Sequence, residues 1–178
     1  MKQHTAGFVV CLMALGLIGG IKVCGEEKQA APKIAGMPLT ICCDVDTVAS
    51  DGVILSQGGD SYGYALYLKS GRPVFSLRTK DALASARANA KEKGELTSIT
   101  ASRTVSGRFS LRATLDRDGT MAVFVNGEKV AEGKAPGLIT TQPKDGLVIG
   151  QDTHTPVGEY RVPHALNGTV TNVKITIG

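Results

Sequence analysis

The chain has no tryptophan and only four phenylalanines and four tyrosines among its 178 residues. Its formal net charge of +4 is small, and its lysines and arginines form no basic cluster with interleaved aromatic residues. Nucleic-acid-binding proteins commonly carry such a cluster, so its absence argues against a nucleic-acid partner. The chain is instead rich in glycine, with 22 residues. Valine, isoleucine, leucine and threonine carry most of its strand propensity. Together with the many glycines, this composition is typical of an all-β domain with many turns.

Motifs that carry catalysis are also missing. There is no G-x-S-x-G sequence, no phosphate-binding glycine loop before a helix, and no E-x-D-x-E strand of the kind that some β-sandwich enzymes use to cleave glycosidic bonds. The run Asp116-Arg117-Asp118-Gly119 begins like a calcium loop, but its twelfth position is Gly127 rather than a glutamate. The sequence therefore predicts a protein that is not an enzyme.

Four cysteines are present, and two of them, Cys11 and Cys24, lie near the N-terminus. Cys42 and Cys43 are neighbours in a predicted strand, so their side chains point to opposite faces and are poorly placed to form a disulfide. Neither His154 nor His164 stands at a recognised zinc spacing from them. We expect Cys43 to pack in the core and Cys42 to be partly exposed.

The N-terminus begins MKQH and continues with an almost uninterrupted apolar run from Ala6 to Ile21. This pattern predicts a secretory signal peptide over residues 1–25, cleaved after Gly25, and a secreted or periplasmic protein without membrane attachment after cleavage. Two alternatives are an uncleaved membrane anchor, for which the run is short, and a lipoprotein modified at Cys24. Residues 26–37 are polar and proline-containing, and are predicted to be a linker.

From residue 38 to residue 178 the pattern predicts one antiparallel two-sheet β-sandwich. Short apolar or alternating runs are separated by turns rich in glycine, asparagine, aspartate and proline. Thr79–Glu95 interrupts this rhythm, and we expect it to form a short surface helix or a loop. The expected strands start at Leu39 and cover Val53–Leu55, Tyr64–Leu68, Val74–Leu77, Leu96–Ala101, Gly107–Leu115, Met121–Val125, Lys129–Ala131, Gly146–Gly150 and Gly168–Ile177.

Two loops carry the residues best suited to binding. Asp60 and Tyr62 lie between two expected strands, and Asp152 and Tyr160 lie in a long polar loop. Carboxylates on loops at a sandwich edge can hold calcium, and tyrosines can stack on sugar rings. We therefore take these four as candidate ligand-binding residues, with Asp60 and Asp152 as candidate calcium ligands and no other cofactor expected. The alternative is that both aspartates only stabilise turns.

Four blocks of sequence then suggest a family. They are DGVILSQGGDSYGYALYLKSGRPVFSLR, DGTMAVFVNGEKVAEGKAPGLI, DGLVIGQDTHTPVGEY and LNGTVTNVKITI. Together they resemble the laminin G-like, concanavalin A-like jelly-roll domain found at the C-terminal end of many bacterial arylsulfatases. The resemblance spans residues 38–178. It implies an accessory module without sulfatase activity, because the Cys/Ser-x-P-x-R pattern is absent: the run Cys42-Cys43-Asp44-Val45-Asp46 does not match it.

The resemblance implies a secreted module that binds carbohydrate, such as a sulfated polysaccharide, or docks on a sulfatase-type partner. A structural or protein-interaction domain without glycan binding is the second hypothesis. A glycosidase or lyase on the same fold is the third. Fold alone does not choose among them, because jelly rolls carry many unrelated functions.

Overall fold

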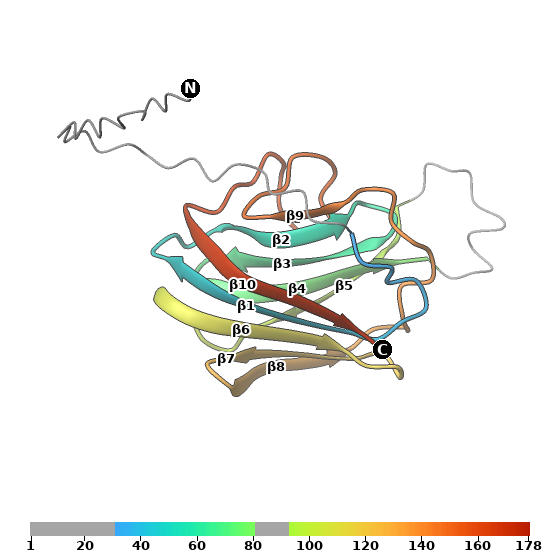
Figure 1. Cartoon of the computed structure of the whole chain (residues 1–178), viewed down its shortest axis with the longest axis horizontal. Coiled ribbons are helices and arrows are strands. Elements are labelled where there is room, and N and C mark those ends of the chain that lie inside the picture. The colour runs from blue at the N-terminus through green and yellow to red at the C-terminus, as the bar shows by residue number, and fades with distance from the viewer. Residues whose placement is uncertain (1–30, 81–92) are drawn as a thin grey trace, which may run out of the picture.

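The computed structural model describes residues 31–80 and 93–178, and all the regular structure in these two ranges is β-strand (Figure 1). Each strand expected from the sequence is present. The ten strands are β1 (Leu39–Thr47), β2 (Gly52–Gly58), β3 (Gly63–Lys69), β4 (Arg72–Thr79), β5 (Glu95–Thr100), β6 (Gly107–Leu115), β7 (Thr120–Val125), β8 (Glu128–Lys134), β9 (Leu147–Ile149) and β10 (Gly168–Ile177).

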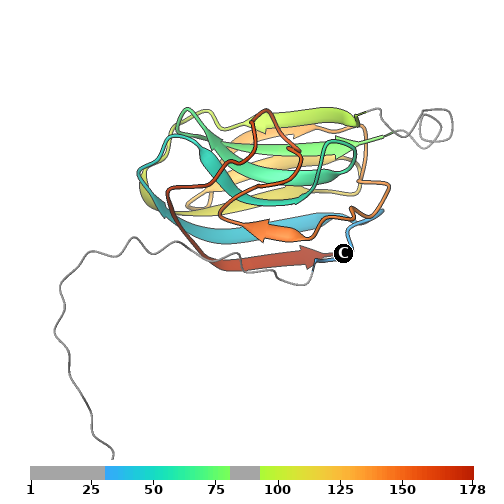
Figure 2. The same cartoon turned by 90° about the horizontal axis from the view of Figure 1, so that it is seen from above.

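The strands form two five-stranded sheets. One has the order β10-β1-β6-β7-β8 and the other the order β5-β4-β3-β2-β9, and every neighbouring pair is antiparallel. The first and last strands of the domain lie side by side at one edge of the molecule (Figure 1, Figure 2). The predicted two-sheet antiparallel sandwich is thus confirmed.

The β10-β1-β6-β7-β8 sheet, called here the open sheet, is buried on one face only. Along β1, Leu39, Ile41, Cys43 and Val45 are buried, and the residues between them are more exposed. Strand β6 alternates in the same way. This alternation is the result of packing one face on the core and leaving the other in solvent.

The β5-β4-β3-β2-β9 sheet differs because its central strands are buried on both faces. All residues of β2 are buried, as are all of β3 except its last. Tyr64 and Leu66 point into the main core, while Ala65 and Tyr67 belong to a second apolar cluster on the outer face. Residues 150–167, called here the cover segment, supply Val157 to that cluster. One sheet of the sandwich is therefore covered by its own chain.

Residues 31–37, at the end of the predicted linker, hold no strand but are fastened to the domain. Ile34 is fully buried, and its backbone N–H donates to Gln142 Oε1 at 2.8 Å. The predicted signal peptide (1–25) lies outside the described residues, as do residues 81–92 of the expected helix or loop at Thr79–Glu95. Within 31–80 and 93–178, no helix is long and apolar enough to cross a membrane.

The two described cysteines lie as expected, since Cys43 is buried, Cys42 is half-buried, and both are free thiols. Burial raises the pKa of the Cys43 thiol to about 12, and the neighbouring Asp44 and Cys42 add to the effect. The thiolate is the reactive form of cysteine. Cys43 should therefore stay unreactive at neutral and mildly alkaline pH.

We predict that a maleimide added to the native protein at pH 8 labels Cys42 and not Cys43. In a Cys42→Ser variant the number of labelled thiols, measured by mass spectrometry, should fall by one in the native state. Unfolding in urea should then release Cys43 for labelling. If the number of thiols labelled in the native state fell in a Cys43→Ser variant instead, the burial assigned to Cys43 would be wrong.

Candidate functional site

The four candidate residues chosen from the sequence fall in two different places. Asp60 and Tyr62 line a groove at the end of the sandwich, whereas Asp152 and Tyr160 bond to each other within the cover segment and do not line that groove. The groove, called here the rim groove, encloses about 310 Å³. It is lined by Gly58, Gly59, Asp60, Ser61, Tyr62, Thr141, Gln142, Pro143, Lys144, Asp145 and Thr155.

The rim groove is built on the tight turn between β2 and β3. Gly58 and Gly63 close this turn with φ values of +94° and +151°, a backbone conformation that favours glycine. The backbone N–H of Gly59 donates to the carbonyl of Tyr62 at 3.0 Å. Lys80 Nζ lies 5.8 Å from the centre of the Tyr62 ring, which is within the range of a cation–π contact. The turn therefore presents Asp60 and Tyr62 at the groove, with Lys80 beside the Tyr62 ring.

Asp152 and Tyr160 form a buried pair. Asp152 is 2% exposed, and its Oδ2 accepts a 2.6 Å hydrogen bond from the Tyr160 hydroxyl while its Oδ1 accepts from the backbone N–H of His154 at 3.2 Å. Burial, and next the bond to Asp152, raise the pKa of Tyr160, so its hydroxyl keeps the proton that it donates. The Tyr160 ring also packs edge-on against Tyr67, with centroids 4.9 Å apart. The hydrogen bond therefore braces the cover segment internally, and the packing of Tyr160 on Tyr67 joins the segment to the sheet.

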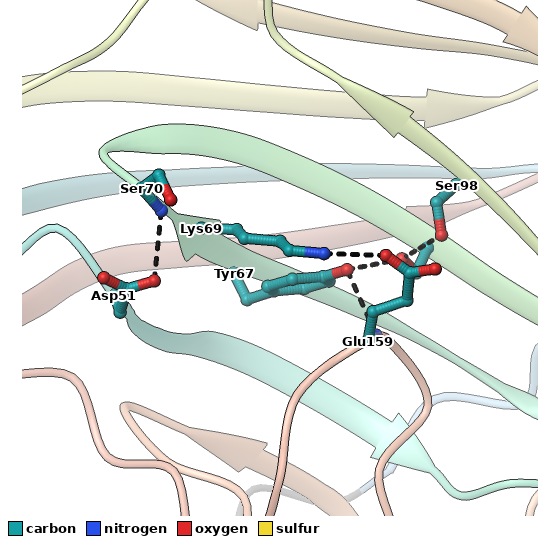
Figure 3. A network of polar contacts seen from close by, with 7 residues as sticks. Asp51, Tyr67, Lys69, Ser70, Ser98 and Glu159 are labelled. Atoms are coloured by element: carbon teal, nitrogen blue, oxygen red, sulfur yellow. Dashed lines mark hydrogen bonds and ion pairs between the residues drawn. The ribbon is translucent and has the colours of Figure 1, made fainter.

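Further polar contacts join the cover segment to the outer face of the sheet (Figure 3). The backbone N–H of Glu159 donates to the Tyr67 hydroxyl at 3.2 Å, and Lys69 Nζ lies 2.7 Å from Glu159 Oε2. Arg78 Nε donates to the carbonyl of Val157 at 2.8 Å. The Lys69–Glu159 pair is exposed and contributes little stability on its own. The Tyr67 hydroxyl and the Arg78 guanidinium nevertheless each find a hydrogen-bond partner in the segment that covers the face.

The proposed calcium ligands, Asp60 and Asp152, do not share one site. In the described part of the chain, no three His, Cys, Asp or Glu side chains are grouped so that they could hold a metal ion. Both oxygens of Asp152 are engaged by the protein itself. The arrangement at Asp152 is the one expected for an aspartate that stabilises its own loop.

A larger hollow, of about 440 Å³, lies on the solvent face of the open sheet. We call it the polar trough. Most of its side chains carry hydrogen-bonding groups, and they come from β1, β6, β10 and the turn between β7 and β8. The trough is lined by Asp44, Val45, Asp46, Arg108, Phe109, Ser110, Asn126, Thr169, Thr171 and Asn172.

Two asparagines in left-handed backbone conformations shape the polar trough. Asn172 has φ +52° and lies in a β-bulge of β10, where Asn172 and Val173 stand opposite the single residue Cys43. Its Nδ2 donates to Asp44 Oδ2 at 2.7 Å. Asn126, with φ +51° in the β7–β8 turn, accepts from the backbone N–H of Ser110 at 2.9 Å through Oδ1. Bulges and αL residues of this kind re-aim side chains and gather at functional sites.

Charge in the polar trough is mixed. Arg108 Nη2 lies 3.4 Å from Asp46 Oδ2, and the two side chains are 84% and 50% exposed. A pair so exposed is weakly held, and its groups remain available to a ligand. The polar trough thus offers acceptors at Asp44 and Asp46 and donors at Arg108 and Asn172 over a rigid sheet.

Sequence reasoning did not select the trough residues as a site. The alternation in 39–46 and 107–115 placed Asp44, Asp46, Arg108 and Ser110 on outward faces, and this was the available signal. However, β1 and β6 are paired across more than sixty residues of sequence, since Asp46 stands opposite Arg108. No local sequence pattern predicts such long-range pairing or the bulge at Asn172.

No family model and no curated protein match this sequence. Solved structures do match it in shape. Domains LG4-5 of the mouse laminin alpha1 chain give a TM-score of 0.61 at 15% identity, over 84% of this chain and 38% of that one. A CBM40 of the Ruminococcus gnavus IT-sialidase, bound to alpha2,3 sialyllactose, gives 0.54 at 16% identity, over 80% and 76% of the two chains. A SAP-like pentraxin from Limulus polyphemus gives 0.52 at 20% identity, over 83% and 66%.

These similarities define the class of fold. The chain is an all-β, concanavalin A-like jelly roll with laminin G-like neighbours. It spans less than half of the laminin fragment that it matches. At such low identities the likeness concerns the fold, and the residues of the site have to be argued from this chain itself.

We predict that Tyr160→Phe loosens the cover segment by leaving the buried Asp152 carboxylate without its hydroxyl donor. An unsatisfied buried group costs about 1–3 kcal/mol, and more when it is charged. The free energy of unfolding in urea should fall by this amount, and amide exchange should quicken in residues 150–167.

Tyr64→Phe is the matched control. Tyr64 is also buried, and its hydroxyl donates to the neutral Gln57 Oε1 at 3.1 Å. Tyr64→Phe should lower the free energy of unfolding by less than Tyr160→Phe does. It should leave amide exchange in residues 150–167 unchanged. Equal losses in the two variants would show that the Asp152–Tyr160 bond has no special role in holding the cover segment.

Proposed function

We propose that this protein is an exported, non-catalytic β-sandwich module that binds carbohydrate in the polar trough of its open sheet. The observation that carries the proposal is the asymmetry of the sandwich. The outer face of one sheet is occupied by the cover segment, whereas the outer face of the other carries a polar hollow of about 440 Å³. A hollow of this size is in the range of small-ligand sites.

The chemistry of the polar trough suits a sugar. Sugar hydroxyl groups both donate and accept hydrogen bonds, and they require partners of both kinds held at fixed positions. Asp44 accepts, Asn172 and Arg108 donate, and Ser110 does both. The strands and the Asn172–Asp44 bond fix the side chains of Asp44 and Asn172 before a ligand arrives, which lowers the entropy lost on binding.

The fold neighbours support the same class of ligand. One of them is a sialidase CBM40 bound to sialyllactose. The N-terminal apolar run supports export, with cleavage after Gly25 and a secreted or periplasmic location. Docking on a protein partner, such as the sulfatase suggested by the sequence resemblance, is the second candidate function, and the loops of the rim groove would be its natural surface.

We predict that Asp44→Asn weakens carbohydrate binding about tenfold, since a hydrogen bond to a charged group contributes roughly 1.5 kcal/mol or more. Affinity electrophoresis in gels containing dextran, polygalacturonate or dextran sulfate measures the effect. Asp116→Asn, which removes an exposed carboxylate from the β6–β7 turn, is the control and should bind as the wild type does. The proposal fails if none of the three polysaccharides retards the protein, or if reducing ends are released from them.

The rim groove provides a separate test of the proposed location. Asp60→Asn and Tyr62→Ala should change retardation in the same gels less than about twofold if the ligand lies in the polar trough. Thermal unfolding of each variant checks that the fold is kept. A large loss in these variants, with Asp44→Asn unaffected, would move the binding site to the rim groove.

A further inference from the structure

A row of aligned side chains crosses the open sheet next to the polar trough. The register pairs Lys174 of β10 with Cys42 of β1, Cys42 with Arg112 of β6, Arg112 with Phe124 of β7, and Phe124 with Lys129 of β8. Cys42 points outward because its neighbour Cys43 is buried, and paired residues share a face. The row therefore places three cations on the solvent face of five consecutive strands.

Two of these cations lack a counterion. Within residues 31–80 and 93–178, Arg112 and Lys174 form no ion pair, whereas Lys129 is paired with Glu132. Arg112 and Lys174 flank Cys42 and stand two strand spacings apart, or about 10 Å between backbones. Their long side chains can reach a single group above Cys42, whose own side chain is short.

Arg112 is held in position by Phe124. The guanidinium carbon lies 3.9 Å from the centre of the Phe124 ring. This contact orients the planar guanidinium without using its N–H donors. Two N–H groups on one edge of the guanidinium, called here its fork, therefore remain available for two parallel hydrogen bonds. A guanidinium presented in this way matches the oxygens of a carboxylate or a sulfate.

Arg112 borders a hollow that joins the polar trough. This second hollow, of about 360 Å³, is lined in part by Cys42 and Arg112, and it shares Asp44, Ser110 and Asn172 with the trough. A chain of sugars lying along β1 and β6 would meet hydroxyl-binding groups at Asp44 and Asn172. One row further along, it would meet the unpaired cations.

We infer that Arg112 and Lys174 bind an anionic substituent, a carboxylate or a sulfate ester, of the glycan held in the polar trough. This inference rests on the proposed function and adds the class of ligand, an acidic saccharide. Phe124 is a positioning residue, because it acts only through the guanidinium of Arg112.

The test compares Arg112→Gln and Lys174→Gln with wild type in gels of dextran sulfate, polygalacturonate and neutral dextran. Each variant should lose about tenfold in affinity for the acidic polymer that retards the wild type, because each removes a charge-assisted contact. Whether dextran sulfate or polygalacturonate is retained distinguishes sulfate from carboxylate. Affinity for neutral dextran should not change in either variant.

Arg161→Gln is the control for net charge, since Arg161 is an exposed residue of the cover segment. Arg112→Lys keeps the charge but not the fork, and should still lose about fivefold if the contact is bidentate. Equal losses in Arg112→Gln and Arg161→Gln, or wild-type binding by Arg112→Lys, would indicate diffuse attraction and overturn the inference. Retention on neutral dextran alone would also overturn it and leave the proposed function standing, whereas retention on no polymer would end both.

Discussion

The hydrogen bond from Tyr160 to the buried carboxylate of Asp152 braces the cover segment, and the Tyr160 ring packs that segment against Tyr67 on the outer face of the β5-β4-β3-β2-β9 sheet. A buried carboxylate without hydrogen-bond partners would be costly. The conformation of the segment is therefore stable because the Tyr160 hydroxyl and the His154 amide both donate to the Asp152 carboxylate. The covered face explains why β2 and β3 are buried on both sides. It also leaves the other sheet as the open, polar surface of the sandwich.

The proposed function rests on this asymmetry. The outward residues of the open sheet face solvent, so apolar side chains there would add no stability. These positions can therefore hold polar side chains suited to a ligand. Asp44, Arg108 and Asn172 lie on rigid strands, and the bulge at Asn172 aims its amide at Asp44. Arg112 and Lys174, which form no ion pair with any residue that the structure describes, extend the same surface. The proposed site is therefore built on strands and needs no long loops.

Strand positions could be predicted from the sequence because they depend on local patterns. Alternation fixed the buried face of β1, including the opposite fates of Cys42 and Cys43, and Asn126-Gly127 marked the β7–β8 hairpin. The candidate residues were less predictable. Asp60 and Tyr62 do line one groove, but Asp152 and Tyr160 form an internal pair, because nothing local tells a loop that covers a sheet from a loop that extends into solvent.

The fold class, the ten strands and the lack of recognisable catalytic motifs could all be read from the sequence, since each depends on residue type and short-range spacing. Which sheet face is open, and which residues meet on it, depends on how the whole chain packs. Asp44 and Asn172 are 128 positions apart, yet a bulge in an edge strand joins them by one hydrogen bond. Contacts between residues so far apart in the sequence depend on the packing of the whole sandwich. Local sequence patterns therefore do not predict them.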